Sequence, residues 1–278
     1  MNETESGVRA GGALGSRLRG GGVRGSMLTL CLASLLSGCE LLQQVQISRA
    51  GASYFEPELK GFVESDDESN GTRIDLENTI DFDKDSAIGY RGTLAIGQAS
   101  VDVRYLEHDL DAQVTLSETV RFGEQVFANG SMVDADYELT YLDIRSRFPL
   151  TAVGPVSIDG QIGFEYVNNE MKIVSGQDVA EESFDQWFPT LGIGGSFVFP
   201  LGEDFTVFVD GDVAVLPWPF LDVDGFYLDG TARAGIQMSF FSVGGGWRRI
   251  DFDLEDKASD FEMDYRLEGP FFFGELVF

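Results

Sequence analysis

Polar and apolar residues alternate along most of the chain after residue 45. Between residues 156 and 166, every second position is apolar or glycine, and the positions between them carry polar groups such as Asp159 and Glu165. A period of two is typical of a β-strand with one apolar and one polar face, and no window after residue 45 sustains the 3.6-residue apolar period of a helix. Three further segments repeat the pattern: 88–96, 205–215 and 226–240. The sequence therefore predicts an all-β protein.

The alternation predicts about ten strands joined in an up-and-down antiparallel order, although eight or twelve remain compatible with it. The connections between strands are alternately short and long, which indicates a sheet whose two rims face different environments. The strands are expected near 54–64, 87–96, 99–110, 134–148, 155–168, 187–200, 204–216, 223–241, 242–254 and 262–278. The long or polar connections are expected at 65–86, 111–133, 169–186, 217–222 and 255–261.

Two structures explain this alternation: a soluble barrel with its apolar face inside, and a transmembrane β-barrel with that face toward lipid. Strands of this length match the roughly 9–11 residues that a tilted strand needs to cross a bilayer. The polar face carries many formal charges, which suits a lumen better than a dry core. The chain also has 34 glycines in 278 residues, above the ordinary share of about 7%. These features favour the transmembrane barrel.

The last strand ends on an aromatic residue. Phe272, Gly274, Leu276 and Phe278 share one face of the segment 272–278. This ending resembles the C-terminal assembly signal of Gram-negative outer-membrane β-barrels. The resemblance is to small barrel proteins of an uncharacterised family and covers roughly residues 52–278, which sets the barrel domain at 54–278.

The resemblance implies an integral outer-membrane protein with both ends in the periplasm and its long loops outside the cell. It also implies three partners: outer-membrane lipid, lipopolysaccharide, and the barrel-assembly machinery during biogenesis. No activity comes with the resemblance.

The first 38 residues read as a segment removed during export. Four arginines in a glycine-rich stretch precede a short apolar run that starts at Met27, and this order is typical of a secretory signal. The residues Leu36, Ser37, Gly38 and Cys39 resemble a bacterial lipobox, which implies that Cys39 becomes the acylated N-terminus and residues 39–53 a linker. An ordinary signal that happens to contain a cysteine is the alternative, and Met27 is an alternative start.

Charge and composition narrow the function. The formal net charge is −28, whereas a nucleic-acid binder needs a basic surface, so we expect no nucleic-acid partner. Cys31 and Cys39 are the two cysteines, so the barrel domain has neither disulfides nor thiolate chemistry. We therefore expect no cofactor, no metal site and no catalytic residues.

The lumen is the first candidate for chemistry. Twelve charged positions are expected to point inward, and among them acids outnumber bases eight to four. Salt bridges that fill the barrel are the first interpretation, and a narrow pore that prefers cations is the second. The candidate lumen charges are Arg91, Asp102, Arg104, Asp159, Glu165, Asp210, Asp212, Asp229 and Arg233, together with Glu58, Lys60 and Glu275.

Other groups offer weaker signals. His108 is the only histidine and falls on the lumen side near the outer rim, where a general base would need a carboxylate from another strand to orient it. The acidic stretches 64–70 and 81–85 read as solvated loops. An aromatic girdle at the membrane interface is expected from Trp187, Trp218, Trp247, Tyr137, Tyr141, Tyr166 and Tyr265.

The sequence thus predicts a lipid-modified outer-membrane barrel with a structural or surface-interaction role, presenting acidic loops outside, and not an enzyme. Three alternatives stay open: a cation-preferring pore, a rim-located hydrolase that uses His108, and a soluble, lipid-tethered barrel that binds an apolar ligand.

Overall fold

The structure is a computed structural model that describes residues 45–65, 72–82, 85–216, 223–256 and 261–278. The export segment with Cys39 lies outside the described residues, as do Trp218 and most of the acidic stretch 64–70. In the described part of the chain, no helix is long and apolar enough to span a membrane.

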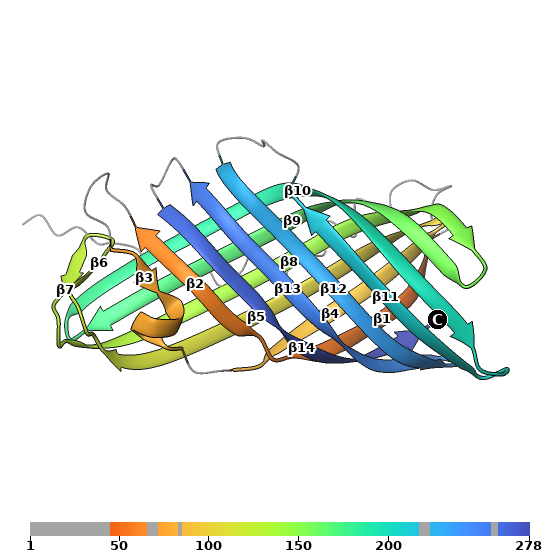
Figure 1. Ribbon diagram of the computed structural model, residues 1–278, viewed down its shortest axis with the longest axis horizontal. Helices are drawn as coiled ribbons and strands as arrows, with labels where there is room; N and C mark the ends of the chain where they lie inside the picture. The colour runs from red at the N-terminus through yellow and green to blue at the C-terminus, as the bar shows by residue number, and fades with distance from the viewer. Residues whose placement is uncertain (1–44, 66–71, 83–84, 217–222, 257–260) are drawn as a thin grey trace, which may run out of the picture. The chain divides into compact units, whose positions relative to one another are not determined.

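Strands make up nearly all of the described chain (Figure 1). They are β1 (Val45–Phe55), β2 (Glu58–Ser65), β3 (Ile74–Asp75), β4 (Ala87–Ile96), β5 (Ala99–Thr115), β6 (Val120–Phe122), β7 (Gln125–Phe127), β8 (Met132–Val153), β9 (Val156–Ser175), β10 (Asp178–Pro200), β11 (Phe205–Val215), β12 (Val223–Met238), β13 (Phe241–Asp256) and β14 (Phe261–Val277). A single π-helical turn, η2 (Leu76–Ile80), follows β3.

The strands close into a ten-stranded antiparallel barrel, as the sequence predicts. Sequential strands pair from β4 through β14, apart from the small β6–β7 hairpin, and β1 pairs with both β4 and β14 to close the ring. β1 and β2 both pair with β14 and together form one interrupted strand of the barrel, because the chain bends at Glu56 and Pro57. The Glu56 N–H donates to the Pro270 carbonyl across this break.

An apolar band of outward-facing side chains surrounds one part of the barrel. On β9, Ile162 is 52% exposed and Phe164 is 56% exposed. Such residues point away from the interior on strands all round the barrel, which a soluble barrel would avoid. The apolar band comprises Tyr54, Ile88, Tyr90, Ile158, Ile162, Phe164, Trp187, Leu191, Ile193, Phe197, Val209, Val213, Phe226, Ile236, Val243, Trp247, Phe272 and Leu276.

Beyond the apolar band the same strands continue, but there their apolar residues face the interior and their polar residues face outward. On β9 the outward residues up to Phe164 are apolar, but from Val167 through Met171 the apolar residues point inward and are buried. β8 reverses in the same way between Tyr141 and Leu142. We call this part the extension. It comprises residues 107–115, 132–140, 167–175, 178–186, 250–256 and 261–268 of the long strands, together with β2, β3, η2, β6 and β7.

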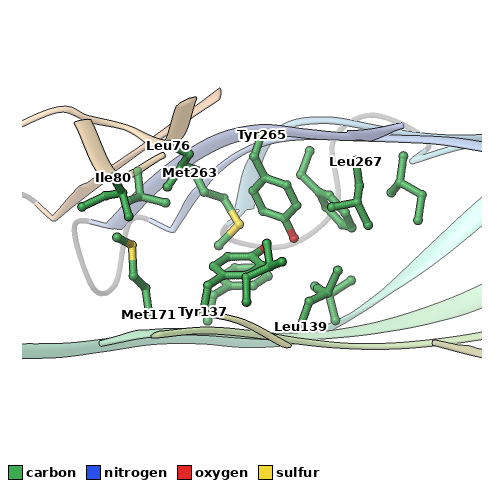
Figure 2. Packing of buried hydrophobic residues seen from close by; sticks show 14 of the residues in the cluster. Leu76, Ile80, Tyr137, Leu139, Met171, Met263, Tyr265 and Leu267 are labelled. Atoms are coloured by element: carbon green, nitrogen blue, oxygen red, sulfur yellow. The ribbon is translucent and has the colours of Figure 1, made fainter. Parts of the chain in front are cut away.

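The extension has its own apolar core (Figure 2). Tyr137, Leu139, Met171, Tyr265 and Leu267 pack across its interior, each no more than 1% exposed. Aromatic rings continue the packing from Phe82 through Tyr137, Tyr265, Phe252 and Tyr227 to Phe188, with successive centroids 4.8–6.1 Å apart. The extension is therefore filled in the manner of a soluble β-barrel.

One stretch of the extension wall lacks a strand-to-strand pairing. Among the described residues, β4 pairs with β5 as far as Ile88 and Glu107, and β2 pairs on this side with the two residues of β3. η2 lies in the gap and turns Leu76 and Ile80 into the core. The Asp75 carboxylate caps the turn by accepting from two backbone N–H groups.

Several strand ends differ from the prediction. The barrel begins at Val45, inside the expected linker 39–53. The expected loop 169–186 is instead the continuation of β9 and β10 around a tight turn, and 111–133 contains the end of β5, a small hairpin and the start of β8. The polar residues in these segments are the outward face of the extension, and their inward partners are apolar, so the segments pair as strands.

The predicted aromatic girdle is wrong in part. Trp187 and Trp247 face outward in the apolar band, and Tyr166 stacks on Trp187 with centroids 5.0 Å apart. In contrast, Tyr137, Tyr141 and Tyr265 are at most 1% exposed and belong to the interior. Tyr137 and Tyr265 lie in the extension, where apolar residues point inward, and Tyr141 lies at the point on β8 where the alternation reverses.

Candidate functional site

Inside the apolar band, the barrel is filled by charged side chains. We call this group the charge network; it consists of five carboxylates and five guanidinium groups from β4, β5, β8, β9, β11, β12 and β13. Burying charge is costly unless each group has a partner of opposite sign. The members are Arg91, Asp102, Arg104, Asp143, Arg145, Arg147, Glu165, Asp212, Asp229 and Arg248.

Arg145 is the centre of the charge network and is completely buried. Its guanidinium lies 2.7 Å from Glu165 and 2.7 Å from Asp229, 2.9 Å from Asp212 and 3.0 Å from Asp143. The carboxylates of Asp143, Glu165 and Asp229 lie close enough together to hold a metal ion. In this arrangement the guanidinium supplies the positive charge that a cation would supply, and its planar set of donors matches several carboxylates at once.

A second layer of the network surrounds Asp212 and Asp102. Arg104 donates to Asp212 at 2.8 Å, and Arg147 bridges Asp102 at 2.7 Å and Asp212 at 2.9 Å. Arg91 completes the layer by donating to Asp102 at 2.8 Å. These contacts join β4, β5, β8 and β11 across the lumen, so the network cross-links opposite walls of the barrel.

A smaller group lies beside the network. The Arg233 guanidinium contacts Asp210 at 2.7 Å and Glu275 at 2.5 Å, and Arg49 lies 3.6 Å from Glu275. A cavity of about 60 Å³ adjoins Arg104 and Arg233. That volume has room for a few water molecules, and not for a larger ligand.

Tyr141 marks the boundary between the charge network and the apolar core. Its hydroxyl is 3.0 Å from Glu165, 3.1 Å from Asp229 and 2.7 Å from the Tyr227 hydroxyl. The Arg248 guanidinium lies over the Tyr141 ring, 4.7 Å from its centroid, in a cation–π contact. The interior thus passes directly from salt bridges to packed aromatic rings.

The structure places the nine candidate lumen charges, and also Glu275, on inward-facing positions. The expectation that Glu58 and Lys60 point inward is wrong, because β2 turns them outward, where Lys60 contacts Glu58 and Glu268 at 3.2 Å each. Asp143, Arg145, Arg147 and Arg248 were missed by the sequence analysis. With them, the inward-facing charges comprise eight acids and six bases, so the predicted acidic excess remains but is smaller than expected.

The missed arginines had a sequence signal. Arg145 and Arg147 share strand parity with Tyr137, Leu139 and Tyr141, which are buried. The signal was obscured because the inward face of β8 changes from apolar to charged at this point.

His108 lies in the extension and is 2% exposed. Its Nε2 is 3.3 Å from the Asp85 carbonyl, which can only accept, so Nε2 carries the proton. Nδ1 has no hydrogen-bond partner among the described residues. Burial lowers the pKa of the imidazole, against the opposing effect of Asp85. The structure therefore shows a buried histidine that is hydrogen-bonded to the backbone just before β4.

The side chains of the C-terminal residues belong to the outward-facing apolar surface of the barrel. Phe272, Leu276 and Phe278 are 62%, 48% and 64% exposed, and Gly274 shares their side of β14. The Phe278 N–H donates to the Ser48 carbonyl, so the last residue is fixed to β1.

The outer face of the extension carries an acidic wall on β5, β8, β9 and β10. Asp109 is directly opposite Glu138, which is opposite Glu170, and Asp111 is opposite Asp136, while Lys172 lies opposite both Asp136 and Glu181. Carboxylates directly opposite one another across strands are destabilising unless cations attenuate the repulsion. The acidic wall consists of Glu107, Asp109, Asp111, Asp134, Asp136, Glu138, Glu170, Glu181 and Asp185.

Comparisons with known proteins identify the fold. No protein-family model matches the chain, and a search of curated proteins gave no match. The chain is similar to the outer membrane protease OmpT from Escherichia coli, with a TM-score of 0.52 and 12% identity over 84% of this chain and 97% of that one.

Two further structures match with lower scores. They are the transport unit of the autotransporter AIDA-I from Escherichia coli (TM-score 0.37, 8% identity, 91% of this chain and 96% of that one) and the translocator domain of the autotransporter NalP from Neisseria meningitidis (0.35, 9%, 92% and 96%). Only the first likeness is strong enough to use, and it shows the fold alone: the chain has the fold of an outer-membrane β-barrel.

Proposed function

We propose that the protein is an integral outer-membrane barrel with a sealed lumen, and that it holds the acidic wall outside the cell as an interaction surface for cationic partners. The observation that supports this proposal is that side chains fill the interior of the barrel. The charge network occupies the barrel within the apolar band and the apolar core occupies the extension, so the chemistry available to a partner is on the outer face.

The lengths of the connections support one orientation in the membrane. Val45 and Val277 lie at the end of the barrel opposite the extension, where the turns after β4, β8, β10 and β12 are only a few residues long. Short periplasmic turns and longer external segments are the rule for bacterial barrels. This supports a periplasmic N-terminus and an external extension. Export through the segment 1–38, acylation of Cys39 and recognition of the Phe278 ending by the assembly machinery belong to the same proposal.

The sealed lumen makes the first prediction. The wild-type barrel, reconstituted in a planar bilayer, is expected to show no steady conductance, because oppositely charged groups and packed rings occupy its cross-section. The same preparation should shift on a denaturing gel when it is boiled, since closed barrels often resist detergent until heated. Steady cation-selective conductance would replace the sealed barrel with the pore alternative. Release of the protein by osmotic shock without a gel shift would contradict the integral barrel.

Binding to the acidic wall is tested with polylysine as the cationic probe on the reconstituted barrel. We expect saturable binding that weakens as salt is raised, since the attraction is between exposed charges. The variant Asp136→Asn, Glu138→Gln, Glu170→Gln should lower the affinity about tenfold. Glu203→Gln with Asp204→Asn, in an exposed turn at the opposite end, is the control and should leave binding unchanged. Equal binding by the wall variant would refute the surface role.

A hydrolase is the second candidate, because the fold is shared with a protease. In that case His108 must be reachable, whereas it is 2% exposed and bonded to the Asp85 carbonyl. We expect His108→Gln to leave any peptidase activity of the purified barrel unchanged. Loss of an activity that the wild type shows would favour the hydrolase.

The same variant tests the role of His108 in stability. Its pKa is lowered in the folded state, so the unfolded chain binds the proton more readily below about pH 6.5. Stability from the neutral imidazole is therefore present above that pH and is lost as pH falls, by at most about 1.4 kcal/mol per pH unit. Urea unfolding of the extension at pH 7.5 and 5.5 should show a smaller difference in His108→Gln than in the wild type. An equal difference would mean that His108 does not contribute.

A further inference from the structure

The gap in the extension wall contains a cavity of about 270 Å³. It lies where the described residues of β2 and β5 are not joined by strand pairing and η2 lies between them. An engineered cavity of about 150 Å³ takes a benzene molecule, so this one has room for a small organic molecule. Strand edges without a strand partner are also places where a ligand can approach the backbone.

The lining of the cavity is divided by polarity. Its buried part is apolar: Leu76 is 1% exposed and Leu110 is 5% exposed, and Leu59 and Phe82 pack against the same core. This part therefore suits a hydrocarbon stem.

The exposed part of the lining is polar and mainly acidic. Glu58, Glu77 and Asp81 supply three carboxylates, and Asn78 adds an amide. Lys60 is the basic group, and its ammonium is directed to Glu58 and Glu268, 3.2 Å away in each case. The carboxylates therefore exceed the basic charge, and the entrance favours a positive ligand.

The backbone beside the entrance has uncommon conformations. Leu76–Ile80 form a π-helical turn, a form that is rare and frequent at functional sites. Asp81 follows in the left-handed region at φ 54°, and its N–H donates to the Leu76 carbonyl. This hydrogen bond fixes the Asp81 backbone at the entrance and does not use the Asp81 side chain.

We propose that this cavity binds an organic cation that carries an ammonium group on an apolar stem. The stem lies against Leu59, Leu76 and Leu110, and the ammonium meets the carboxylates of Glu77 and Asp81. The site is separate from the acidic wall and from the charge network, so it stands or fails independently of the proposed function.

The test uses three probes of equal stem length, n-hexylammonium, n-hexanol and n-hexanoate, with the full barrel in lipid nanodiscs. Titration calorimetry should show saturable binding of hexylammonium, at least about tenfold tighter than that of the other two, because only the ammonium gains from the carboxylates. Equal affinity for all three probes would mean partition into lipid or apolar packing alone, and would overturn the proposal.

The site is located with paired variants. Glu77→Gln with Asp81→Asn should weaken hexylammonium binding about tenfold, and asparagine tolerates the left-handed conformation at position 81. Glu203→Gln with Asp204→Asn removes the same two charges at the far end of the barrel and should change nothing. The heat-dependent gel shift checks that both variants fold. Unchanged affinity in the cavity variant would place the binding elsewhere and overturn the proposal.

Two sources supply such a ligand: a free amine, or the basic side chain of a polypeptide. A lysine-containing tripeptide with blocked ends serves as the second probe. Binding at least about tenfold tighter than hexylammonium would identify a polypeptide, and equal or weaker binding would identify a small amine. In either case the affinity must fall in the cavity variant.

Discussion

Arg145→Ala is expected to lower the free energy of unfolding by about 3–5 kcal/mol, since removing one partner of a buried ion group leaves the others uncompensated. Arg145 contacts four carboxylates within 3.0 Å and is completely buried. The four carboxylates would then be compensated only by the neighbouring arginines of the charge network. The measurement is urea unfolding of the barrel in detergent.

The same variant should open a conducting path. Without the Arg145 guanidinium, the charge network keeps five carboxylates but four bases, and a space remains where the side chain was. We expect a cation-selective leak in planar bilayers, where the wild type is silent. Arg249→Ala is the matched control, because Arg249 is 43% exposed and, in the part of the chain that the structure describes, forms its ion pair with Asp251. A stable, silent Arg145→Ala barrel would show that the network does not seal the lumen.

Phe252→Ala is expected to destabilise the extension by about 3–5 kcal/mol, the usual cost of replacing a buried phenylalanine. Phe252 is fully buried, with its ring centroid 4.8 Å from that of Tyr265 and 5.1 Å from that of Tyr227. The cavity left behind interrupts the row of rings that fills the extension. Limited proteolysis should cleave the extension of this variant while the heat-dependent gel shift of the membrane part remains.

The neighbouring residue provides the control for this prediction. Asp253 lies opposite Asp264 on β14, and its partial burial, together with the like charge of Asp264, raises its pKa. Asp253→Asn should therefore leave stability unchanged or raise it slightly. If Phe252→Ala lost both the extension and the gel shift, the two parts would not be separate packing units.

The ten barrel strands were predictable because polar and apolar residues alternate with a period of two in the sequence. A strand keeps that period whichever of its faces is apolar. The ends of the strands were not predictable. On β9 the inward face changes from charged at Glu165 to apolar from Val167 onward, and the outward face becomes polar. The polar residues of 169–186 therefore indicated a loop, although this segment continues β9 and β10.

The candidate site was predictable residue by residue but not as a group. Parity places Asp212 and Asp229 in the lumen, and the structure has them there. Parity does not show that the Arg145 side chain would contact both carboxylates. Such contacts depend on which strands face each other across the closed barrel. The facing strands are set by the combined register of all the strand pairs. The cavity beside η2 was likewise unpredictable, because it arises where a strand pairing is missing.

The last strand gives the assembly of this molecule a particular order. β14 pairs with β1, β2 and β13, and it contributes Tyr265 and Leu267 to the core of the extension and Phe272 to the apolar band. Until β14 has paired with β1, β2 and β13, neither interior is complete, and apolar side chains that belong on opposite sides of the wall are exposed together. Ring closure between segments more than 200 residues apart is slow in folding. Closing the ring is therefore the step that separates the two sets of apolar side chains, those of the core from those of the apolar band.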